Sequence, residues 1–147
     1  MRENMVRIKL NPIAEAIKGK RVVLIDDSIV RGTTSARLVK LVREAGAKEI
    51  HMRISSPPFV APCYYGTDID SKDNLIACNH TLDEIAKILE VDSLGYLKKE
   101  DLLKIAGEGK CGDFCSACFD EKYPTDIPKG DGKSRFECKI SENKNKK

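Results

Sequence analysis

The chain has 147 residues, which is enough for one domain or for a domain with a small subdomain. Hydrophobic residues make up 41% and charged residues 33%, so a folded core is expected, and no run approaches the ~18 apolar residues of a membrane span. The net charge of +3 arises in residues 129–147, which contain seven Lys and Arg and three Asp and Glu; this segment is expected to be a disordered polar tail. The remaining residues sum to −1, which argues against nucleic-acid binding.

Strands and helices are predicted to alternate from the start of the chain. In MVRIKL (5–10) apolar residues alternate with basic ones, which indicates a half-buried strand. Asn11 and Pro12 suit the N-cap and first position of a short helix that Gly19 would end. RVVLI (21–25) is a continuous apolar run and predicts a parallel strand buried on both faces.

A second helix and a further strand follow at βαβ spacing. The helix is expected over about 35–45, ended by Gly46, with an apolar stripe formed by Leu38, Leu41, Val42 and Ala45. EIHMRIS (49–55) predicts a strand whose inward residues are Ile50, Met52 and Ile54. This succession is typical of an α/β fold with a parallel sheet and flanking helices.

The pattern changes after the two prolines at 57 and 58. Residues 59–78 contain turn signals without a clear period. Thr81 and Glu84 form a capping-box pattern, so a helix is expected over 82–90, and a shorter one over 100–106. We therefore expect a sheet-forming part over 1–62, a small helical segment with cysteines over 63–128, and the tail.

The carboxyl end of the 21–25 strand is a candidate ligand site. Asp26 and Asp27 lie where ligands bind in open parallel sheets, and ending the strand there lets both carboxylates reach solvent. The next segment, residues 28–35, offers a glycine, three hydroxyls and a helix N-terminus, which together suit an anion. A sugar phosphate with Mg²⁺ fits this combination, whereas the plain alternative is an ordinary strand-to-helix connection. A Walker motif is absent from the sequence.

The six cysteines indicate a metal or cluster site. The N-terminus has no signal-peptide pattern, so a cytoplasmic location is expected, where structural disulfides are rare. Cys115 and Cys118 have C-x₂-C spacing, which is compatible with zinc or an iron–sulfur cluster and less so with a redox pair. Cys78 and Cys138 are expected to bind nothing. The two histidines, His51 and His80, are expected to be structural or solvent-exposed.

Several segments resemble one enzyme family. VVLIDDSIVRGTTS (22–35) resembles the phosphoribosyl pyrophosphate (PRPP) motif of type I phosphoribosyltransferases. In the form DDSIVRGTTS, together with REAGAKEIHMRISSPP, CYYGTDI and CSACF, it is similar to the C-terminal third of the glutamine PRPP amidotransferases. That family makes 5-phosphoribosylamine from PRPP and glutamine, the first step of purine synthesis, so a glycosyltransferase of the type I phosphoribosyltransferase fold is expected.

The resemblance implies roles for particular residues. Asp26 and Asp27 would hold the ribose hydroxyls and Mg²⁺. The PRPP-binding loop would comprise Ser28, Val30, Arg31, Gly32, Thr33, Thr34 and Ser35. Some family members carry a structural [4Fe–4S] cluster, and its ligand positions fall on Cys63, Cys115 and Cys118. Cys111 is a possible substitute for the fourth ligand, and Zn²⁺ held by these four cysteines is the alternative.

The resemblance also implies partners. Purine nucleotides would inhibit the complete enzyme, and this enzyme would be a homo-oligomer. A missing N-terminal half would have to supply the glutaminase domain, the first strands of the sheet and the pyrophosphate loop. No catalytic residue is assigned in this chain, and activity of the chain alone is not expected. The alternatives are a PRPP-sensing regulator without catalysis and a cysteine-based zinc module.

Overall fold

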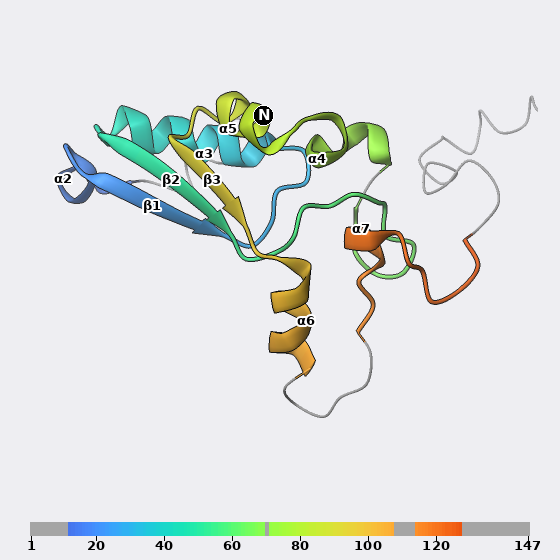
Figure 1. Ribbon diagram of the computed structural model, residues 1–147. Helices are drawn as coiled ribbons and strands as arrows, with labels where there is room; N and C mark the ends of the chain where they lie inside the picture. The colour runs from blue at the N-terminus through green and yellow to red at the C-terminus, as the bar shows by residue number, and fades with distance from the viewer. Residues whose placement is uncertain (1–11, 70, 108–113, 128–147) are drawn as a thin grey trace, which may run out of the picture.

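A parallel sheet of three strands, in the order β1–β2–β3, forms the centre of the molecule (Figure 1). The computed structural model describes residues 12–69, 71–107 and 114–127. The strands are Arg21–Asp26 (β1), Glu49–Ile54 (β2) and Ser93–Tyr96 (β3). The predicted α/β class with a parallel sheet is confirmed.

The helices are short, apart from one of twelve residues. They are α2 (Ala14–Ile17), α3 (Thr33–Glu44), η1 (Lys72–Asn74), α4 (Ile76–Asn79), α5 (Leu82–Ile88), α6 (Lys99–Gly107) and α7 (Ala117–Asp120). Figure 1 shows α3 and α5 on one face of the sheet, and α6 and α7 beyond the carboxyl ends of the strands. Within the described ranges no helix is both long and apolar enough to cross a bilayer.

The core lies between β2 and the helices on that face. Ile50, Met52 and Ile54 are at most 3% exposed, as their alternation predicts. They pack with buried residues of α3 and α5, among them Val39 and Ile85. The period-two pattern of β2 therefore predicts correctly which side chains enter the core.

Burial of β1 on both faces is wrong for this structure. Its residues alternate between exposed and half-buried, and Val23 and Ile25 are 59% and 79% exposed. The reason is that no described element lies over the face of the sheet to which these two side chains belong. Within the described residues, only one of the two faces of β1 is therefore packed against other elements.

Two helices differ from expectation. The first begins at Ala14 with Ile13 as its N-cap, rather than at Asn11 and Pro12, and it ends before Gly19 as predicted. Helix α3 begins at Thr33 and buries Ser35, Val39 and Val42. Of the predicted stripe, Val42 is buried, whereas Leu38, Leu41 and Ala45 are half-buried. The buried residues Ser35, Val39 and Val42 follow one another at intervals of four and three, so the buried stripe of the helix lies to one side of the predicted one.

The strand β3 was not expected, because four residues containing Gly95 carry too little periodicity to indicate a strand. Its pairing with β2 adds a strand to the segment that we expected to be helical. The capping box of α5 is confirmed: Thr81 Oγ1 accepts from Glu84 N, and Glu84 Oε2 accepts from Thr81 N. The predicted strand at 5–10 and the predicted tail at 129–147 lie outside the described residues.

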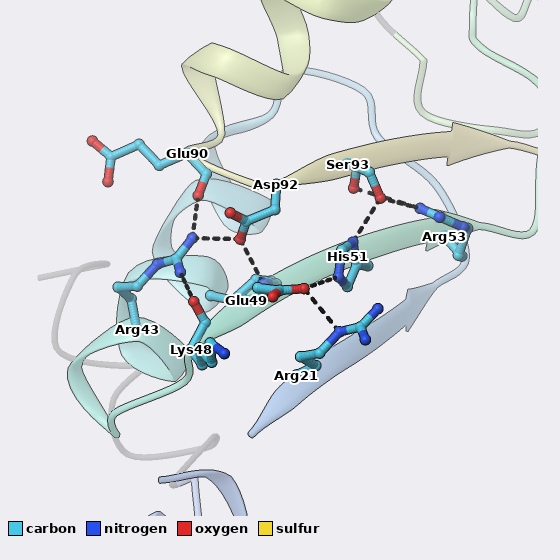
Figure 2. Close-up of polar contacts among 10 residues, drawn as sticks. Arg21, Arg43, Lys48, Glu49, His51, Arg53, Glu90, Asp92 and Ser93 are labelled. Atoms are coloured by element: carbon cyan, nitrogen blue, oxygen red, sulfur yellow. Dashed lines mark hydrogen bonds and ion pairs between the residues drawn. The ribbon is translucent and has the colours of Figure 1, made fainter. Parts of the chain in front are cut away.

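A polar clasp joins the amino ends of β2 and β3 (Figure 2). Asp92 Oδ2 accepts from Ile50 N at 2.7 Å and from Arg43 Nη2 at 3.0 Å. Arg43 also donates to the carbonyl oxygens of Lys48 and Glu90. These contacts bind the end of α3 to the turn before β3, and they hold the pKa of Asp92 below its usual range, chiefly through the bond from the Ile50 amide.

Replacing Asp92 by asparagine is expected to lower the free energy of unfolding at pH 7 by about 1 kcal/mol, a value reduced for the partial exposure of both partners. Because the pKa is depressed on folding, this stabilisation is present above the unfolded-state pKa and is lost as the pH falls through the folded-state pKa. The free energy of unfolding, measured by urea denaturation, should therefore fall more steeply with acidification in the wild type than in Asp92→Asn. The exposed Asp126→Asn variant serves as the control, and an identical acid dependence of wild type and Asp92→Asn would contradict the assignment.

Candidate functional site

The connection from β1 to α3 carries the two predicted carboxylates. Asp26 is the last residue of β1 and is half-buried, and Asp27 follows it and is exposed. Asp27 N donates to Asp26 Oδ1 at 3.0 Å, and Ser28 Oγ donates to Asp27 Oδ1 at 2.9 Å. Ser55 N donates to Asp26 O at 3.0 Å, which fixes the strand end against β2. Both carboxylates thus stand at the carboxyl edge of the sheet with oxygens available to a ligand.

The loop after these carboxylates is fastened to the body of the protein. Ile29 is 2% exposed and belongs to the main core. Val30 O accepts from Ile76 N at 2.9 Å, which ties the loop to α4. Gly32 is buried and has φ +79°, and a Cβ at this position would lie 2.8 Å from Ile76 Cδ1. Only glycine meets both conditions without strain, so the loop conformation depends on it.

The first turn of α3 presents polar groups next to the carboxylates. Thr33 and Thr34 are exposed, whereas Ser35 is only 3% exposed. The first intrahelical bond of this turn is from Ala36 N to Gly32 O, and no side chain caps the helix. The amides at the start of a helix have no partner within it, and the helix dipole makes this end positive. The segment 28–35 can therefore receive an anion beside two carboxylates.

A groove of about 540 Å³ lies at the end of β3, between Pro57, Tyr96, Lys99 and Phe119, and its lining does not include Asp26 or Asp27. The candidate site at the end of β1 therefore lies outside this groove. Arg31, also predicted here, is exposed.

Two of the predicted cysteine ligands are brought together from distant parts of the chain. Val60 N and Ala61 N donate to Cys118 O at 2.9 and 3.2 Å, which lays α7 against the segment before Cys63. Phe59 and Phe119 stack with ring centroids 5.0 Å apart. Cys63 and Cys118 pack against the same small core cluster. All four described cysteines, including the exposed Cys115 and Cys78, are free thiols.

Cys63 has the features of a thiolate donor. Desolvation raises its pKa, but the backbone amides of Tyr65, Thr67 and Gly66 and the Thr67 side chain stabilise the thiolate by hydrogen bonding, and the pKa falls to about 7. Amide donors to a ligating sulfur are a usual element of iron–sulfur and zinc sites. The turn in CYYGTD that supplies these amides is not recognisable as such from the sequence.

Among the other cysteines, Cys118 is affected by its cysteine neighbours. Burial raises the pKa of Cys118 to about 11, and repulsion from the thiolates of Cys63 and Cys115 contributes. Across the described ranges, however, no group of three His, Cys, Asp or Glu is arranged to hold a metal ion. Cys111, the possible fourth ligand, lies outside these ranges. Thiolates are donors that suit a soft metal, but the described cysteines are not grouped around one point.

In the metal-free chain, Cys63 is expected to react with iodoacetamide about fivefold or more faster than Cys78 at pH 7. The reason is that the pKa of Cys63 is about 7, whereas burial raises that of Cys78 above its ordinary value of 9. Mass spectrometry of the alkylated peptides gives both rates in one sample. Thr67→Val should slow the reaction of Cys63 and leave Cys78 unchanged, and equal rates for the two thiols in the wild type would contradict the assignment.

The sequence and the fold have close relatives among known proteins. The chain is 56% identical over 128 residues to an amidophosphoribosyltransferase of Synechocystis sp. and 53% identical over 130 residues to one of Archaeoglobus fulgidus, each alignment covering 87% of the chain. A solved glutamine PRPP amidotransferase from B. subtilis, complexed with ADP and GMP, superposes with a TM-score of 0.75 at 49% identity over 87% of the chain. No protein-family model matches the sequence.

The similarity is confined to part of each relative. The chain spans 26% and 28% of the lengths of the Synechocystis and Archaeoglobus proteins and 29% of the B. subtilis structure. A second solved structure, described as the allosteric regulatory enzyme of purine biosynthesis, has a TM-score of 0.72 at 50% identity and is covered to 26%. The fold of the chain is therefore that of about one quarter of these proteins.

Proposed function

Because this chain is homologous to about a quarter of the length of the amidophosphoribosyltransferases, we propose that it forms one wall of the PRPP site of such an enzyme. The complete enzyme would transfer ammonia from glutamine to PRPP, releasing pyrophosphate and giving 5-phosphoribosylamine. The observation that carries the proposal is the β1–α3 connection, where Asp26 and Asp27 stand beside a glycine-fixed loop and a helix N-terminus. An aldose phosphate needs this pairing of carboxylates for hydroxyls with amides for a phosphate.

In this proposal the carboxylates and the loop have separate tasks. Asp26 and Asp27 accept hydrogen bonds from the ribose hydroxyls and, with Mg²⁺, orient the sugar. The 5-phosphate lies against the segment made of Ser28, Val30, Arg31, Gly32, Thr33, Thr34 and Ser35. The free amides of the first turn of α3 and the positive end of that helix favour a dianion at this place.

Carboxylate oxygens are the hard donors that suit Mg²⁺, so Asp26 and Asp27 fit this ion. When bound, Mg²⁺ would neutralise charge on the departing pyrophosphate. The same carboxylates would stabilise positive charge that develops on the sugar as the bond to pyrophosphate breaks. Since the described residues form only one wall, the groups that enclose the pyrophosphate must come from elsewhere.

We also propose that Cys63, Cys115 and Cys118 hold a structural metal centre, a [4Fe–4S] cluster or, with Cys111, a zinc ion. Support comes from the packing of Cys63 and Cys118 against the same small cluster and from the amides that stabilise the Cys63 thiolate. Such a centre would fix α7 against the segment from Phe59 to Cys63. Anaerobic loading with iron and sulfide should give an absorbance band near ~400 nm if a cluster forms, whereas a colourless protein with stoichiometric zinc would favour the ion.

The remaining partner would be the part of an amidophosphoribosyltransferase that this chain does not span. Among the described strands none pairs with the outer edge of β1, and this edge together with the exposed Val23 and Ile25 supports an additional strand and covering elements. Purine nucleotides are proposed as inhibitors of the resulting complex, since a solved relative is described with ADP and GMP. A homo-oligomer of the complete enzyme is part of the same proposal.

The test is an assay of the chain co-expressed with the part of the Synechocystis relative that lies outside the matched 128 residues. We expect release of pyrophosphate from PRPP with ammonia or glutamine as the nitrogen donor, and none from either part alone. A folded complex without this activity at saturating Mg²⁺ would contradict the proposed function.

A further inference from the structure

Tyr123 links the chain after α7 to the residue that precedes Cys63. The Tyr123 hydroxyl donates to the carbonyl oxygen of Pro62 at 2.7 Å, and this contact is partly buried. Pro62 is the direct neighbour of Cys63 in the chain, so its carbonyl belongs to the same planar peptide group as the Cys63 amide. Through this hydrogen bond, a side chain far along the sequence holds the backbone of a predicted metal ligand.

The ring of Tyr123 is itself held by two other tyrosines. It meets the ring of Tyr64 edge to face, with ring centroids 5.3 Å apart, and its centroid lies 6.5 Å from that of Tyr65. Tyr65 Oη in turn lies 2.9 Å from Thr125 Oγ1, which is hydrogen-bond distance. Edge-to-face packing is a favoured arrangement of aromatic rings. These contacts therefore direct the Tyr123 hydroxyl toward Pro62.

Backbone hydrogen bonds join the same two segments a few residues away. The carbonyl oxygen of Cys118 accepts from Val60 N and from Ala61 N. On the other side of the predicted ligand, Cys63 N donates to Ile69 O at 3.3 Å. All of these contacts are between protein groups and need no metal ion. The backbone before Cys63 is thus tied both to α7 and to the residues that follow α7.

We propose that Tyr123 is a positioning residue of the cysteine centre, which fixes the backbone of Cys63 relative to Cys118 before a metal ion binds. The inference rests on the proposed function in one respect, because the metal centre is itself a proposal. Ligands from distant parts of a chain lose conformational freedom when a metal joins them, and contacts made beforehand reduce this loss. Groups that hold a ligand without touching the metal commonly change metal affinity by about 10–100-fold.

The first measurement is amide hydrogen exchange of the metal-free, full 147-residue chain, followed by NMR. In Tyr123→Phe the amides of Val60 and Ala61 are expected to exchange about fivefold or more faster, because their segment separates more often from α7. The amide of Met52 in β2 should be unaffected. Tyr64→Phe is the matched control, since it removes a hydroxyl from the same group of rings and leaves the contact with Pro62 in place.

The second measurement is the affinity of each variant for Zn²⁺, obtained by competition with a chromophoric chelator. Tyr123→Phe is expected to bind Zn²⁺ about tenfold or more weakly, and Tyr64→Phe like the wild type. Urea denaturation of the metal-free variants shows whether the fold is intact. Thr125→Val removes the contact with Tyr65 and leaves Tyr123 unchanged, so it should give smaller changes in both measurements and remains informative if Tyr123→Phe unfolds.

Unchanged exchange at Val60 and Ala61 in a folded Tyr123→Phe would overturn the inference and leave the proposed metal centre intact. Faster exchange together with wild-type affinity for Zn²⁺ would also overturn it, since the hydrogen bond would then serve the fold alone. If Tyr123→Phe unfolds, wild-type behaviour of Thr125→Val in both measurements would count against it. A wild-type chain that binds neither Zn²⁺ nor a cluster would contradict the metal centre and the inference together, and would leave the proposed PRPP site untouched.

Discussion

Replacing Gly32 by valine is expected to lower the free energy of unfolding by about 2–4 kcal/mol. Gly32 has φ +79°, which is strained for a β-branched residue, and it is buried with a Cβ position 2.8 Å from Ile76 Cδ1. The strain and the overlap act on the same loop that links β1 to α3. The variant should therefore lose both stability and the shape of the proposed phosphate site, as measured by urea denaturation.

Two glycine variants separate these causes. Gly19 has φ +73° but nothing within 4 Å of its Cβ position, so Gly19→Ala reports backbone strain alone. Gly66 has neither a positive φ nor a neighbour within 4 Å, and Gly66→Ala should leave stability almost unchanged. If Gly32→Val were no less stable than Gly66→Ala, the loop would not depend on the left-handed residue and the site geometry would be in doubt.

Replacing Asp26 and Asp27 together by asparagine is expected to weaken binding of PRPP and Mg²⁺ by about 100-fold or more. Each substitution removes a charge-assisted contact, worth about 1.5–3 kcal/mol. The fold should persist, because asparagine keeps an oxygen that accepts from Asp27 N and from Ser28 Oγ. Calorimetry on the chain together with its complementary part gives the affinity.

The control for this pair is Asp101→Asn, which neutralises a partly exposed carboxylate on α6 that pairs with Lys104. It should bind PRPP like the wild type. Unchanged affinity in the Asp26→Asn and Asp27→Asn double variant, with circular dichroism identical to that of the wild type, would contradict the assignment of these carboxylates.

The parts of the fold that could be predicted are those in which local pattern and burial agree. β2 alternates strictly because one face of it fills the core, and Thr81 and Glu84 cap α5 through contacts three residues apart. The position of Asp26 and Asp27 also follows from the sequence, since a charged pair ends an apolar run. The fold class and the similarity to the glutamine PRPP amidotransferases are confirmed by the comparisons.

The rest depends on contacts between distant residues. The exposure of Val23 and Ile25 follows from the face of the sheet that no described element covers, which an apolar run does not reveal. Cys63 and Cys118 approach each other because amides near Val60 bind the Cys118 carbonyl, 58 positions away in the chain. Arg53 lies against β3 because Ser93 accepts its hydrogen bond and Gly95 leaves space for its side chain. The sequence of these four residues does not predict the strand β3.

The most direct test of the proposed PRPP site is a ¹⁵N NMR titration of the 147-residue chain with PRPP and Mg²⁺. The account predicts that the largest changes in amide chemical shift fall on Gly32, Thr33, Thr34 and Ser35, with smaller ones at Asp27, and that chelation of Mg²⁺ reduces them. The chain need not be catalytically active for this result, because these amides are in place in the described structure. Shifts confined to other residues, or none at millimolar PRPP, would contradict the claim that the β1–α3 connection binds the sugar phosphate.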